Sequence, residues 1–451
     1  MISRRFVLGG IASAAGSALF LGSVSAHTTS GSINAVDFGL KPASKDDQSA
    51  KFNELLKQAA AKGQQIFLPS GTYIVSGLQF PSYVNIAGVS GKTRLQFGGD
   101  KRFISANDGH IQLSGLIIDG DKRPLAKETR GLIEASNISH FVLEDCQIIG
   151  ARKNAIDLFK CAGRIENCRI SGANDVAILS ANATGMTITR NEIGNCGNGG
   201  IIVHRYEQGR DGTIVTGNRI SKIRADAGGT GQQGNGINIF RADNAIVSDN
   251  VIDSCAFSAI RANTAKSLQI TGNNCTGSGE TAIYAEFAFE GAVIANNLVD
   301  GGTNGISMVN FDSGGRMGTC SGNIVRNLSL KGPYIPGPDT PANFGVGISV
   351  EADVAITGNV VENAPLYGIL LGWGPYMRNL IANGNIIRNS GEGIAVSVVK
   401  GVGSAIVTSN IVQGAKRGGI VGHNWLEITV KDLAANAAKH PNLTIDGNSI
   451  S

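Results

Sequence analysis

The sequence is poor in charged, aromatic and proline residues. Of 451 residues, 16% are charged, 6% are aromatic and 11 are proline, and the formal net charge is +4. Nucleic-acid-binding proteins carry a larger excess of basic residues than this. We therefore expect no nucleic-acid partner. Hydrophobic residues (42%) and glycine (62 residues) are abundant. That balance is typical of a folded chain of short strands and tight turns.

Cysteine is present but lacks the paired spacing of a metal site. The seven cysteines are Cys146, Cys161, Cys168, Cys196, Cys255, Cys275 and Cys320. None forms a CxxC pair, so we predict no metal site of that kind. No cofactor is expected; Ca²⁺ stays open, but nothing in the sequence indicates it. Most of the thiols should be buried, although an oxidising compartment would permit a disulfide between neighbouring turns of the chain.

Long hydrophobic runs are missing except near the N-terminus. There Arg4 and Arg5 precede a Gly/Ala-rich apolar stretch that leads to Val24-Ser25-Ala26. Residues 1–26 therefore resemble a twin-arginine signal peptide with a small-residue cleavage site. The resemblance implies export through the twin-arginine translocon to a periplasmic or secreted location, with no membrane contact after cleavage. A retained N-terminal anchor is the alternative.

From about residue 140 to the C-terminus the chain repeats a short phrase, as in IENCRI, VSDNVI and IDGNSI. Its Asn or Cys recurs at positions 146, 168, 191, 218, 250, 273, 297, 323, 359, 385, 410 and 448. Most steps are 22–27 residues, and three are longer, at 32, 36 and 38 residues. A period in the low twenties with insertions is the mark of a solenoid. We expect the Asn side chains to bond from one turn to the next as a ladder, and we assign them no chemistry.

A second phrase, Gly or Ala followed by Ile, runs in step with the first, as at Gly200-Ile201 and Gly347-Ile348. Each repeat thus contains at least two short strands of alternating β-branched residues and leaves no room for a helix. At about 3.3 Å per strand residue, roughly 23 residues close a triangular turn that stacks on the next at about 4.8 Å. We predict an all-β, single-stranded parallel β-helix over residues 101–451.

Residues 27–100 form a segment of a different kind. Phe52, Leu55, Leu56 and Ala59 recur at helical spacing, and Gly63 is placed to end the helix. We predict a capping α-helix, because a helix laid over the first coil would block its open strand edges. The alternating residues 65–75 then read as the first coil.

Two stretches here carry a resemblance to a known family. Val36-Asp37-Phe38-Gly39 and Phe67-Leu68-Pro69-Ser70-Gly71-Thr72-Tyr73 resemble the N-terminal segment of the pectate-lyase-like superfamily. The resemblance implies a right-handed parallel β-helix, but that superfamily includes lyases, hydrolases, epimerases and binding proteins. Residues 41–45 depart from its usual Gly-Asp-Gly-like run. The paired arginines followed by repeats also resemble a family of twin-arginine-exported repeat proteins with no activity assigned.

Candidate functional residues gather on the outward positions of the middle coils, where residues after each Gly/Ala-Ile pair point away from the core. This strip carries His204, Arg205, Tyr206, Asn238, Arg241, Arg261, Tyr284, Glu286, Asn310 and Asp312. The steps of 32 and 36 residues insert loops around residues 224–234 and 333–341, which bracket the strip. Stacked rungs suit an extended polymer, and Trp373, Tyr206 and Tyr284 are candidates to stack on sugar rings.

The residue types on this strip favour lyase or epimerase chemistry on an acidic polysaccharide. We assign His204 as the base, Arg241 and Arg261 as groups that neutralise the uronate carboxylate, and Tyr284 or Tyr206 as the acid. Hydrolysis would instead need two or three carboxylates across the scissile bond, and only Glu286, Asp312 and either Asp157 or Glu351 are available. The sole Asp-Asp pair, Asp46-Asp47, lies in the predicted cap, so hydrolysis is less favoured. Arg205, Tyr206, Asn238, Asn310, Asp312 and Trp373 are assigned to substrate binding. A non-catalytic binder of glycan or envelope polymer, and a purely structural repeat protein, are the alternatives.

Overall fold

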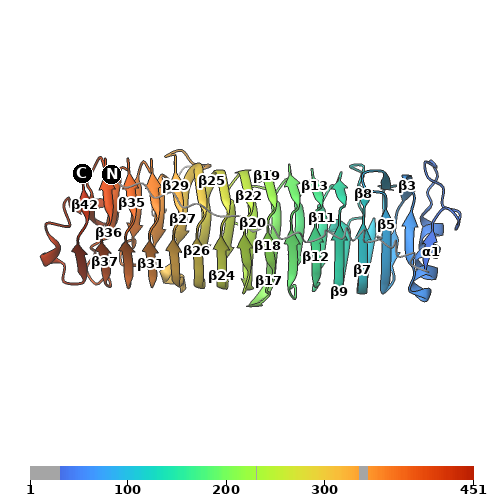
Figure 1. Cartoon of the computed structure of the whole chain (residues 1–451), viewed down its shortest axis with the longest axis horizontal. Coiled ribbons are helices and arrows are strands. Elements are labelled where there is room, and N and C mark those ends of the chain that lie inside the picture. Colours follow the sequence, from blue (N-terminus) through green and yellow to red (C-terminus); the bar gives the residue numbers. More distant parts are fainter. Residues whose placement is uncertain (1–30, 230, 335–343) are drawn as a thin grey trace, which may run out of the picture.

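The computed structural model describes residues 31–229, 231–334 and 344–451, and these form a long parallel β-helix (Figure 1). Each strand pairs in parallel with the strands one coil earlier and one coil later. Within the described residues, one pair of named strands is antiparallel, β39 (Ile420–Asn424) with β40 (Glu427–Val430). The all-β parallel architecture predicted from the two repeated phrases is confirmed. The predicted signal at residues 1–26 lies outside the described residues.

The strands stack in three rows, each forming one face of the rod. The first row, which we call the pocket face, contains β4 (Leu78–Phe80), β7 (Ile104–Ser114), β9 (Gly131–Glu144), β11 (Asn154–Phe159), β14 (Val176–Ala181), β17 (Gly199–Arg210), β20 (Asn235–Asp243), β23 (Ile260–Asn263), β25 (Asn274–Glu286), β27 (Leu298–Met308), β30 (Val346–Val350), β33 (Tyr367–Leu371), β36 (Glu392–Ser397) and β39. From β11 onward each of these strands contains the Gly/Ala-Ile phrase or begins at its Ile, so the predicted outward positions lie on this face.

The second face begins with β1 (Ser32–Asn34) on β2 (Gln65–Leu68) and continues through β5 (Tyr83–Gly88), the later halves of β7 and β9, β12 (Gly163–Glu166), β15 (Met186–Thr189), β18 (Ile214–Thr216), β21 (Ile246–Ser248), β24 (Lys266–Thr271), β26 (Glu290–Ala295), β28 (Arg316–Ser321), β31 (Val354–Thr357), β34 (Leu380–Asn383), β37 (Ala405–Thr408) and β41 (Leu443–Asp446). The third face contains β3 (Gly71–Val75), β6 (Thr93–Phe97), β8 (Leu116–Asp119), β10 (Gln147–Ile149), β13 (Arg169–Ser171), β16 (Glu192–Gly194), β19 (Arg219–Ile223), β22 (Val251–Cys255), the first halves of β25 and β27, β29 (Ile324–Arg326), β32 (Val360–Glu362), β35 (Ile386–Arg388), β38 (Ile411–Gln413) and β42 (Ser449–Ile450).

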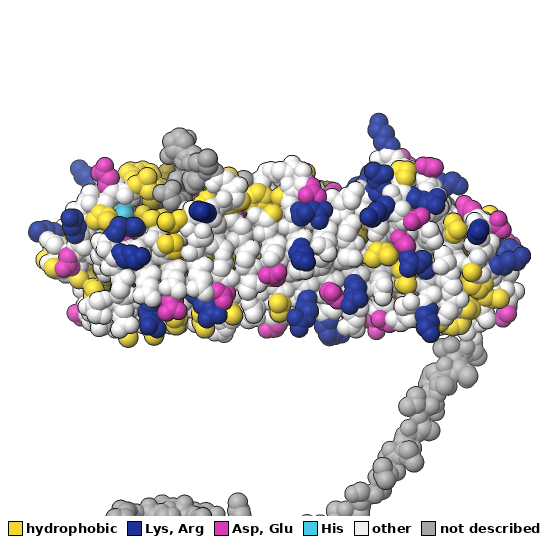
Figure 2. All heavy atoms as spheres, turned by 90° about the horizontal axis from the view of Figure 1, so that it is seen from above, with side chains coloured by type: hydrophobic (Ala, Val, Ile, Leu, Met, Phe, Trp, Pro, Cys, Tyr) yellow, Lys and Arg dark blue, Asp and Glu magenta, His cyan; other side chains and the backbone are white. Residues whose placement is uncertain are grey.

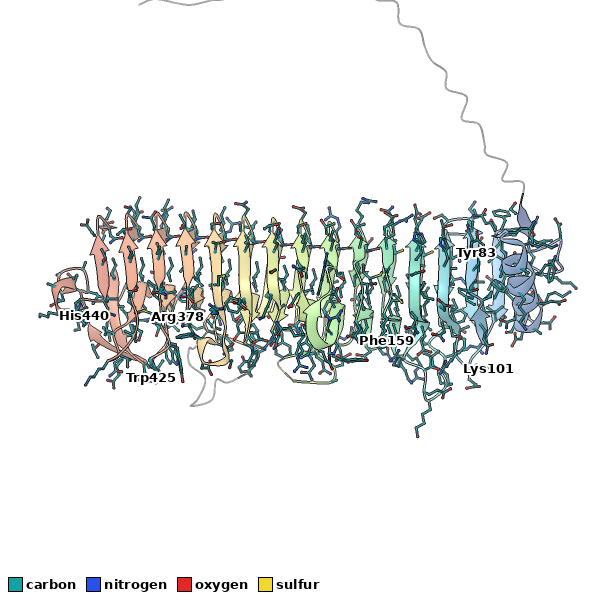
Figure 3. All side chains as sticks on the ribbon, turned by 90° about the horizontal axis from the view of Figure 1, so that it is seen from below. Tyr83, Lys101, Phe159, Arg378, Trp425 and His440 are labelled. Atoms are coloured by element: carbon teal, nitrogen blue, oxygen red, sulfur yellow. The ribbon has the colours of Figure 1, made fainter. Side chains whose placement is uncertain are left out.

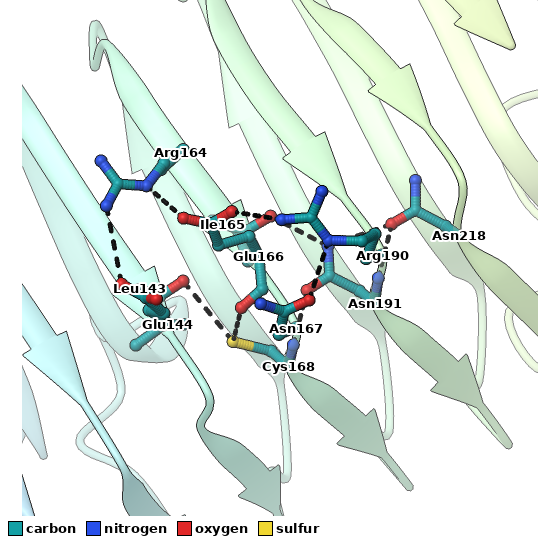
Figure 4. Close-up of polar contacts among 10 residues, drawn as sticks. All are labelled: Leu143, Glu144, Arg164, Ile165, Glu166, Asn167, Cys168, Arg190, Asn191 and Asn218. Carbon is teal, nitrogen blue, oxygen red and sulfur yellow. Dashed lines mark hydrogen bonds and ion pairs between the residues drawn. The ribbon is translucent and has the colours of Figure 1, made fainter. Parts of the chain in front are cut away.

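The predicted Asn ladder runs along the corner between the second and third faces. Asn218 donates through Nδ2 to Asn250 Oδ1 at 2.9 Å, and the same oxygen accepts the backbone N–H of Asn218 at 3.0 Å. The pattern repeats from Asn191 to Asn448. At its start the backbone N–H of Cys168 donates to Asn191 Oδ1 (Figure 4). The ladder therefore satisfies its buried amides internally, as a structural role requires.

The core is a narrow column of Ile, Val, Leu and Ala side chains that point inward from all three faces. Close stacking explains the small residue before each Ile on the pocket face. A Cβ atom added to Gly347 would lie 2.4 Å from the carbonyl oxygen of Gly368 in the next coil. A large side chain at such a position would push the coils apart.

Helix α1 (Ser49–Lys62) lies at one end of the rod (Figure 1). It buries Phe52, Leu55, Leu56 and Ala59, the residues that the periodicity selected. Gly63 ends it in a left-handed conformation with φ of +60°, where a side chain would be strained. The helix is thus where the sequence placed it, and its role as a cap for the first coil stays a prediction. Among the described residues, no helix is long and apolar enough to cross a membrane.

Candidate functional site

Two neighbouring hollows lie on the pocket face. The larger, which we call the His204 pocket, has a volume of about 720 Å³ and lies over β14, β17, β20 and β23. The smaller, the Glu351 pocket, has a volume of about 190 Å³ and lies over β25, β27, β30 and β33. Figure 3 shows the longer loops projecting from one side of the rod, where Phe159, Arg378 and Trp425 also lie.

The insertions that lengthen the repeat form walls of these hollows. Gly231, Gln232 and Gln233, from the loop before β20, line the His204 pocket. Tyr334 and Phe344, on either side of the second insertion, line the Glu351 pocket. Parts of both insertions therefore form walls of the hollows, and residues 335–341 of the second loop lie outside the described residues.

His204 lies in an aromatic and basic environment near the end of the straight part of β17. Its ring stacks on Phe240 of the next coil, with centroids 4.9 Å apart, and meets the ring of Tyr206 edge-on at 5.3 Å. Burial lowers the pKa of His204, and the charge of Arg241 lowers it further. The imidazole is therefore held in its neutral form near neutral pH, which is the form a general base needs.

Arg241 is fixed beside this histidine. Its backbone has a left-handed φ of +56°, its guanidinium lies 4.9 Å from the Phe240 ring centroid, and its Nη1 donates to the backbone oxygen of Tyr206 at 2.8 Å. Tyr206 is 53% exposed, so its hydroxyl is open to solvent. Three predicted residues, His204, Tyr206 and Arg241, are therefore brought together at the edge of the larger hollow.

Two further predicted residues have structural partners near this group. Arg205 donates to the Ala183 carbonyl at 3.2 Å and lies 4.0 Å from Asp211. Asn238 lines the His204 pocket, and its Nδ2 donates to the Gln232 carbonyl at 3.2 Å, which ties the insertion loop to β20. Its Oδ1 is buried without a hydrogen bond from any described residue.

Arg261 is the centre of a buried ion-pair cluster between the two hollows. Its Nε and Nη2 donate to both oxygens of Glu286 at 2.7 and 2.8 Å, and its Nη1 donates to Glu280 at 3.1 Å. Asn263 adds a hydrogen bond to Glu286 at 2.9 Å. Because two carboxylates surround one guanidinium, Arg261 is less suited than Arg241 to neutralise a substrate carboxylate. Glu286 likewise serves chiefly to hold Arg261.

The Glu351 pocket brings together predicted residues that come from several different coils. Tyr284, Asn310 and Trp373 line it, together with Glu280 and Glu351. Burial raises the pKa of Tyr284, so its hydroxyl stays protonated. Burial also raises the pKa of Glu280, against the opposing effects of Arg261 and the Tyr334 hydroxyl, which donates to it at 2.6 Å. The pocket thus combines two buried carboxyl groups with aromatic walls.

Glu351 is the most perturbed carboxyl group of this pocket. Burial raises its pKa to about 7, with a further contribution from the nearby charge of Asp312 and against a hydrogen bond from the backbone N–H of Phe311. That N–H donates to Oε2 at 2.6 Å. Asp312 itself is exposed on the short 3₁₀ helix η1 (Phe311–Ser313). It therefore acts on the pocket through its charge.

Asn310 and Trp373 have structural contacts as well as pocket surfaces. Asn310 adopts a left-handed φ of +71°, and its Oδ1 accepts the backbone N–H of Phe287 at 3.1 Å. Trp373 meets Trp425 of the β39–β40 hairpin edge-on, with centroids 5.7 Å apart. The hairpin thus supports the wall of the Glu351 pocket, a role that the irregular sequence at residues 427–440 did not reveal.

The predicted catalytic residues do not form one site. The register aligns Arg261 with Tyr284 in the next coil, but three strand steps separate the strand of His204 from that of Tyr284. At roughly 4.8 Å per step the separation is about 14 Å along the rod. His204 with Tyr206, and Tyr284 with Glu351, therefore belong to different hollows, and the catalytic roles assigned to them stay predictions.

Some residues of these sites escaped the sequence reasoning. Glu280 comes before the Ala282-Ile283 phrase of its coil, whereas the predicted outward positions follow that phrase. Tyr334 lies in an insertion without periodicity. Figure 2 shows basic and acidic side chains interspersed over one side of the rod. Among the described residues, no group of three or more His, Cys, Asp or Glu could hold a metal ion.

Comparison with known proteins agrees with this architecture. A family model described as right handed beta helix region matches residues 131–210 and 206–378, and one described as rhamnogalacturonase A/epimerase, pectate lyase-like matches residues 32–111. The chain is 27% identical over 139 residues to the SPbeta prophage-derived uncharacterized protein YomE of Bacillus subtilis (strain 168), a match over 28% of this chain. It spans only 21% of that relative's length.

Solved structures that resemble this chain do so at low sequence identity. The N-terminal fragment of gene product 12 of bacteriophage phi29 has a TM-score of 0.54 at 14% identity, over 88% of this chain and 71% of that chain. The A-module of the mannuronan C-5 epimerase AlgE6 of Azotobacter vinelandii has a TM-score of 0.48 at 14% identity, over 93% of this chain and 99% of that chain. The resemblance to twin-arginine-exported repeat proteins stays an expectation. By the match over residues 131–378, the chain belongs to the right-handed β-helix family.

Proposed function

We propose that this protein binds an extended acidic polysaccharide along its pocket face and acts on it as a lyase or epimerase beside the His204 pocket. The observation that carries the proposal is the grouping of His204, Tyr206 and Arg241 at the edge of that hollow. The pectate-lyase-like match over residues 32–111 supports a polysaccharide as the substrate class.

The three side chains supply the groups that proton abstraction next to a carboxylate requires. Arg241 would pair with the uronate carboxylate and so stabilise the negative charge that develops when the C5 proton leaves. His204, kept neutral by burial and by Arg241, would accept that proton. The exposed Tyr206 hydroxyl would donate to the leaving glycosidic oxygen in a lyase, or return a proton to the opposite face of C5 in an epimerase.

Binding without catalysis is the second candidate, and one observation favours it. Arg261, which lines the His204 pocket, is occupied by Glu286 and Glu280. The site therefore has fewer cationic side chains available to a substrate than the sequence predicts. Fewer cations stabilise the negative charge of the transition state less strongly, which favours binding of a glycan over catalysis. In this case the same face would hold a glycan or envelope polymer, or serve a structural role.

Incubation of the purified protein with alginate, pectin and glycosaminoglycans tests the proposal. A lyase would produce unsaturated uronate, detected by ultraviolet absorbance, and an epimerase would change the uronate composition, detected by NMR. His204→Ala should abolish either product, whereas Arg219→Ala, on the exposed third face of the same coil, should not. Binding without product from any of these polymers would reject catalysis and leave the binding function.

We also propose that residues 1–26 direct export by the twin-arginine route to a periplasmic or secreted location. The support is the Arg4-Arg5 pair before the Gly/Ala-rich stretch. Arg4→Lys together with Arg5→Lys should retain the full chain in the cytoplasm, as fractionation and immunoblotting would show. Equal export of the variant would contradict the proposal.

A further inference from the structure

The Glu351 pocket differs from the His204 pocket in size and in charge. Its volume of about 190 Å³ is below the roughly 300–1,000 Å³ of sites for drug-sized ligands. It is therefore suited to one ring rather than to a long segment of polymer. Trp373, Tyr334, Phe344 and Tyr284 supply aromatic surface to its lining.

The charged side chains that line this pocket are all acidic. Among its described lining residues there are two glutamates, Glu280 and Glu351, and no Lys, Arg or His. Both oxygens of Glu280 have partners, Tyr334 for one and Arg261 for the other. A cation that enters the pocket would therefore pair with Glu351 rather than with Glu280.

Glu351 is a buried carboxyl group that lacks a cationic partner. Only 8% of the residue is exposed, and no described Lys, Arg or His forms an ion pair with it. Oε2 accepts the N–H of Phe311, and the backbone N–H of Asn310 provides a further hydrogen bond to the carboxyl group. Arg378 stacks over the Phe311 ring at 4.5 Å but is ion-paired with Asp353. A buried carboxylate without a counter-charge is costly unless a ligand supplies one.

We propose that the Glu351 pocket binds the protonated amino group of an amine-bearing sugar ring. The carboxylate of Glu351 would receive the ammonium, and the aromatic walls would pack on the ring and its cationic end, as in aromatic cages for ammonium groups. The hydroxyl groups of Ser307 and Ser349, 2.8 Å apart in the lining, offer neutral partners to sugar hydroxyls.

This inference rests on the proposed function, because the amine-bearing ring would belong to a glycan that lies along the same face. The two hollows would then select unlike sugars, an acidic one beside Arg241 and a basic one at Glu351. Amine recognition is nevertheless measurable without any reaction at His204, so the two proposals are separable.

Proton linkage gives this site a distinctive signature. Glu351 has a pKa of about 7 in the empty pocket, so near neutral pH a substantial fraction of the carboxyl group is protonated. The other titratable groups of the pocket are Asp312 on η1, Tyr284 and Glu280 on β25, and Tyr334 in the wall. The neighbouring cations, Arg261 and Arg378, are ion-paired with other carboxylates. Binding of an ammonium group would draw Glu351 into its ionised form and release a proton to the buffer.

The experiment is isothermal titration calorimetry of the full chain with a glucosamine tetramer, with the N-acetylated tetramer as the uncharged comparator. Titrations at pH 7 in two buffers of different ionisation enthalpy measure the protons released. We expect the glucosamine tetramer to bind at least about tenfold more tightly than its acetylated form, as one charged hydrogen bond provides. We also expect net proton release, which Glu351→Gln should abolish together with the preference.

The matched control is Glu427→Gln, which removes an exposed glutamate on the supporting hairpin and should leave both results unchanged. His204→Ala and Arg241→Ala should also retain amine binding. Equal affinity for the two tetramers, or a preference that survives Glu351→Gln, would overturn the inference. Loss of acidic-polymer activity with intact amine binding would instead count against the proposed function alone.

Discussion

Two columns of polar side chains run along the molecule, the Asn ladder and the outward residues of the pocket face. They differ in whether their polar groups have partners within the chain. In the Asn ladder, each amide is bonded to the ladder residue of the next coil, from Asn191 to Asn448. On the pocket face, Asn238 Oδ1 has no described donor and Glu351 has no described cationic partner. Stacked coils thus produce polar columns whose hydrogen bonds are complete within the chain and columns whose hydrogen bonds are not. Only the second kind has side chains that are candidates to bind a ligand.

The largest effect should come from Arg261, the strip residue whose guanidinium is held by two buried carboxylates. Arg261→Ala would leave Glu280 and Glu286 buried without their cation, and we expect a loss of about 3–5 kcal/mol in the free energy of unfolding. Urea denaturation measures it. Arg326→Ala removes a solvent-exposed pair with Asp300 on the third face and should have a much smaller effect on stability, because water screens such pairs. Similar losses for the two variants would show that the cluster is not a structural centre.

A break in the middle of the ladder should rank next. Asn273→Ala removes the acceptor of Asn250 and the donor to Asn297, and each buried group left unbonded costs about 1–3 kcal/mol. We expect a total of roughly 2–4 kcal/mol by denaturation. Gln269→Ala, at an exposed position of β24, should change stability by less than about 0.5 kcal/mol. A ladder variant as stable as this control would contradict a structural role.

Glu351→Gln should have a smaller effect of the opposite sign. The folded pKa of Glu351 is raised to about 7, so the wild-type protein loses stability as pH rises from the unfolded value of about 4.3 through the folded one. The variant should lack this loss and be more stable at pH 8 by up to about 3 kcal/mol, with little difference near pH 4. Melting temperatures at both pH values measure it, and the same pH dependence in both proteins would argue against a buried, unpaired carboxyl group.

The smallest change in stability is expected at the His204 site. His204→Ala removes the imidazole ring and Tyr206→Phe removes the phenol hydroxyl, both at the edge of the His204 pocket. Each variant should therefore lose about 1 kcal/mol or less in the free energy of unfolding. Thermal unfolding checks this alongside the product assays described above. A large loss of stability would assign His204 to packing on Phe240 rather than to chemistry.

The fold was predictable because its determinants are periodic. The Asn and Gly/Ala-Ile phrases each mark one position per coil, and the apolar spacing of Phe52, Leu55 and Leu56 marks the helix. The site was predictable only in outline. Contacts such as Tyr334 with Glu280 join residues 54 positions apart, and the occupation of Arg261 by Glu286 depends on register. No local pattern reports either of these contacts.

The most direct test of the account is calorimetric binding of an oligouronate to the wild-type protein, Arg241→Ala and Arg219→Ala. Both arginines lie on exposed parts of the middle coils, but only Arg241 lies beside His204. The account predicts binding that Arg241→Ala weakens by about tenfold or more and that Arg219→Ala leaves unchanged, as expected for one charged contact. No binding by the wild-type protein, or equal binding by both variants, would contradict it.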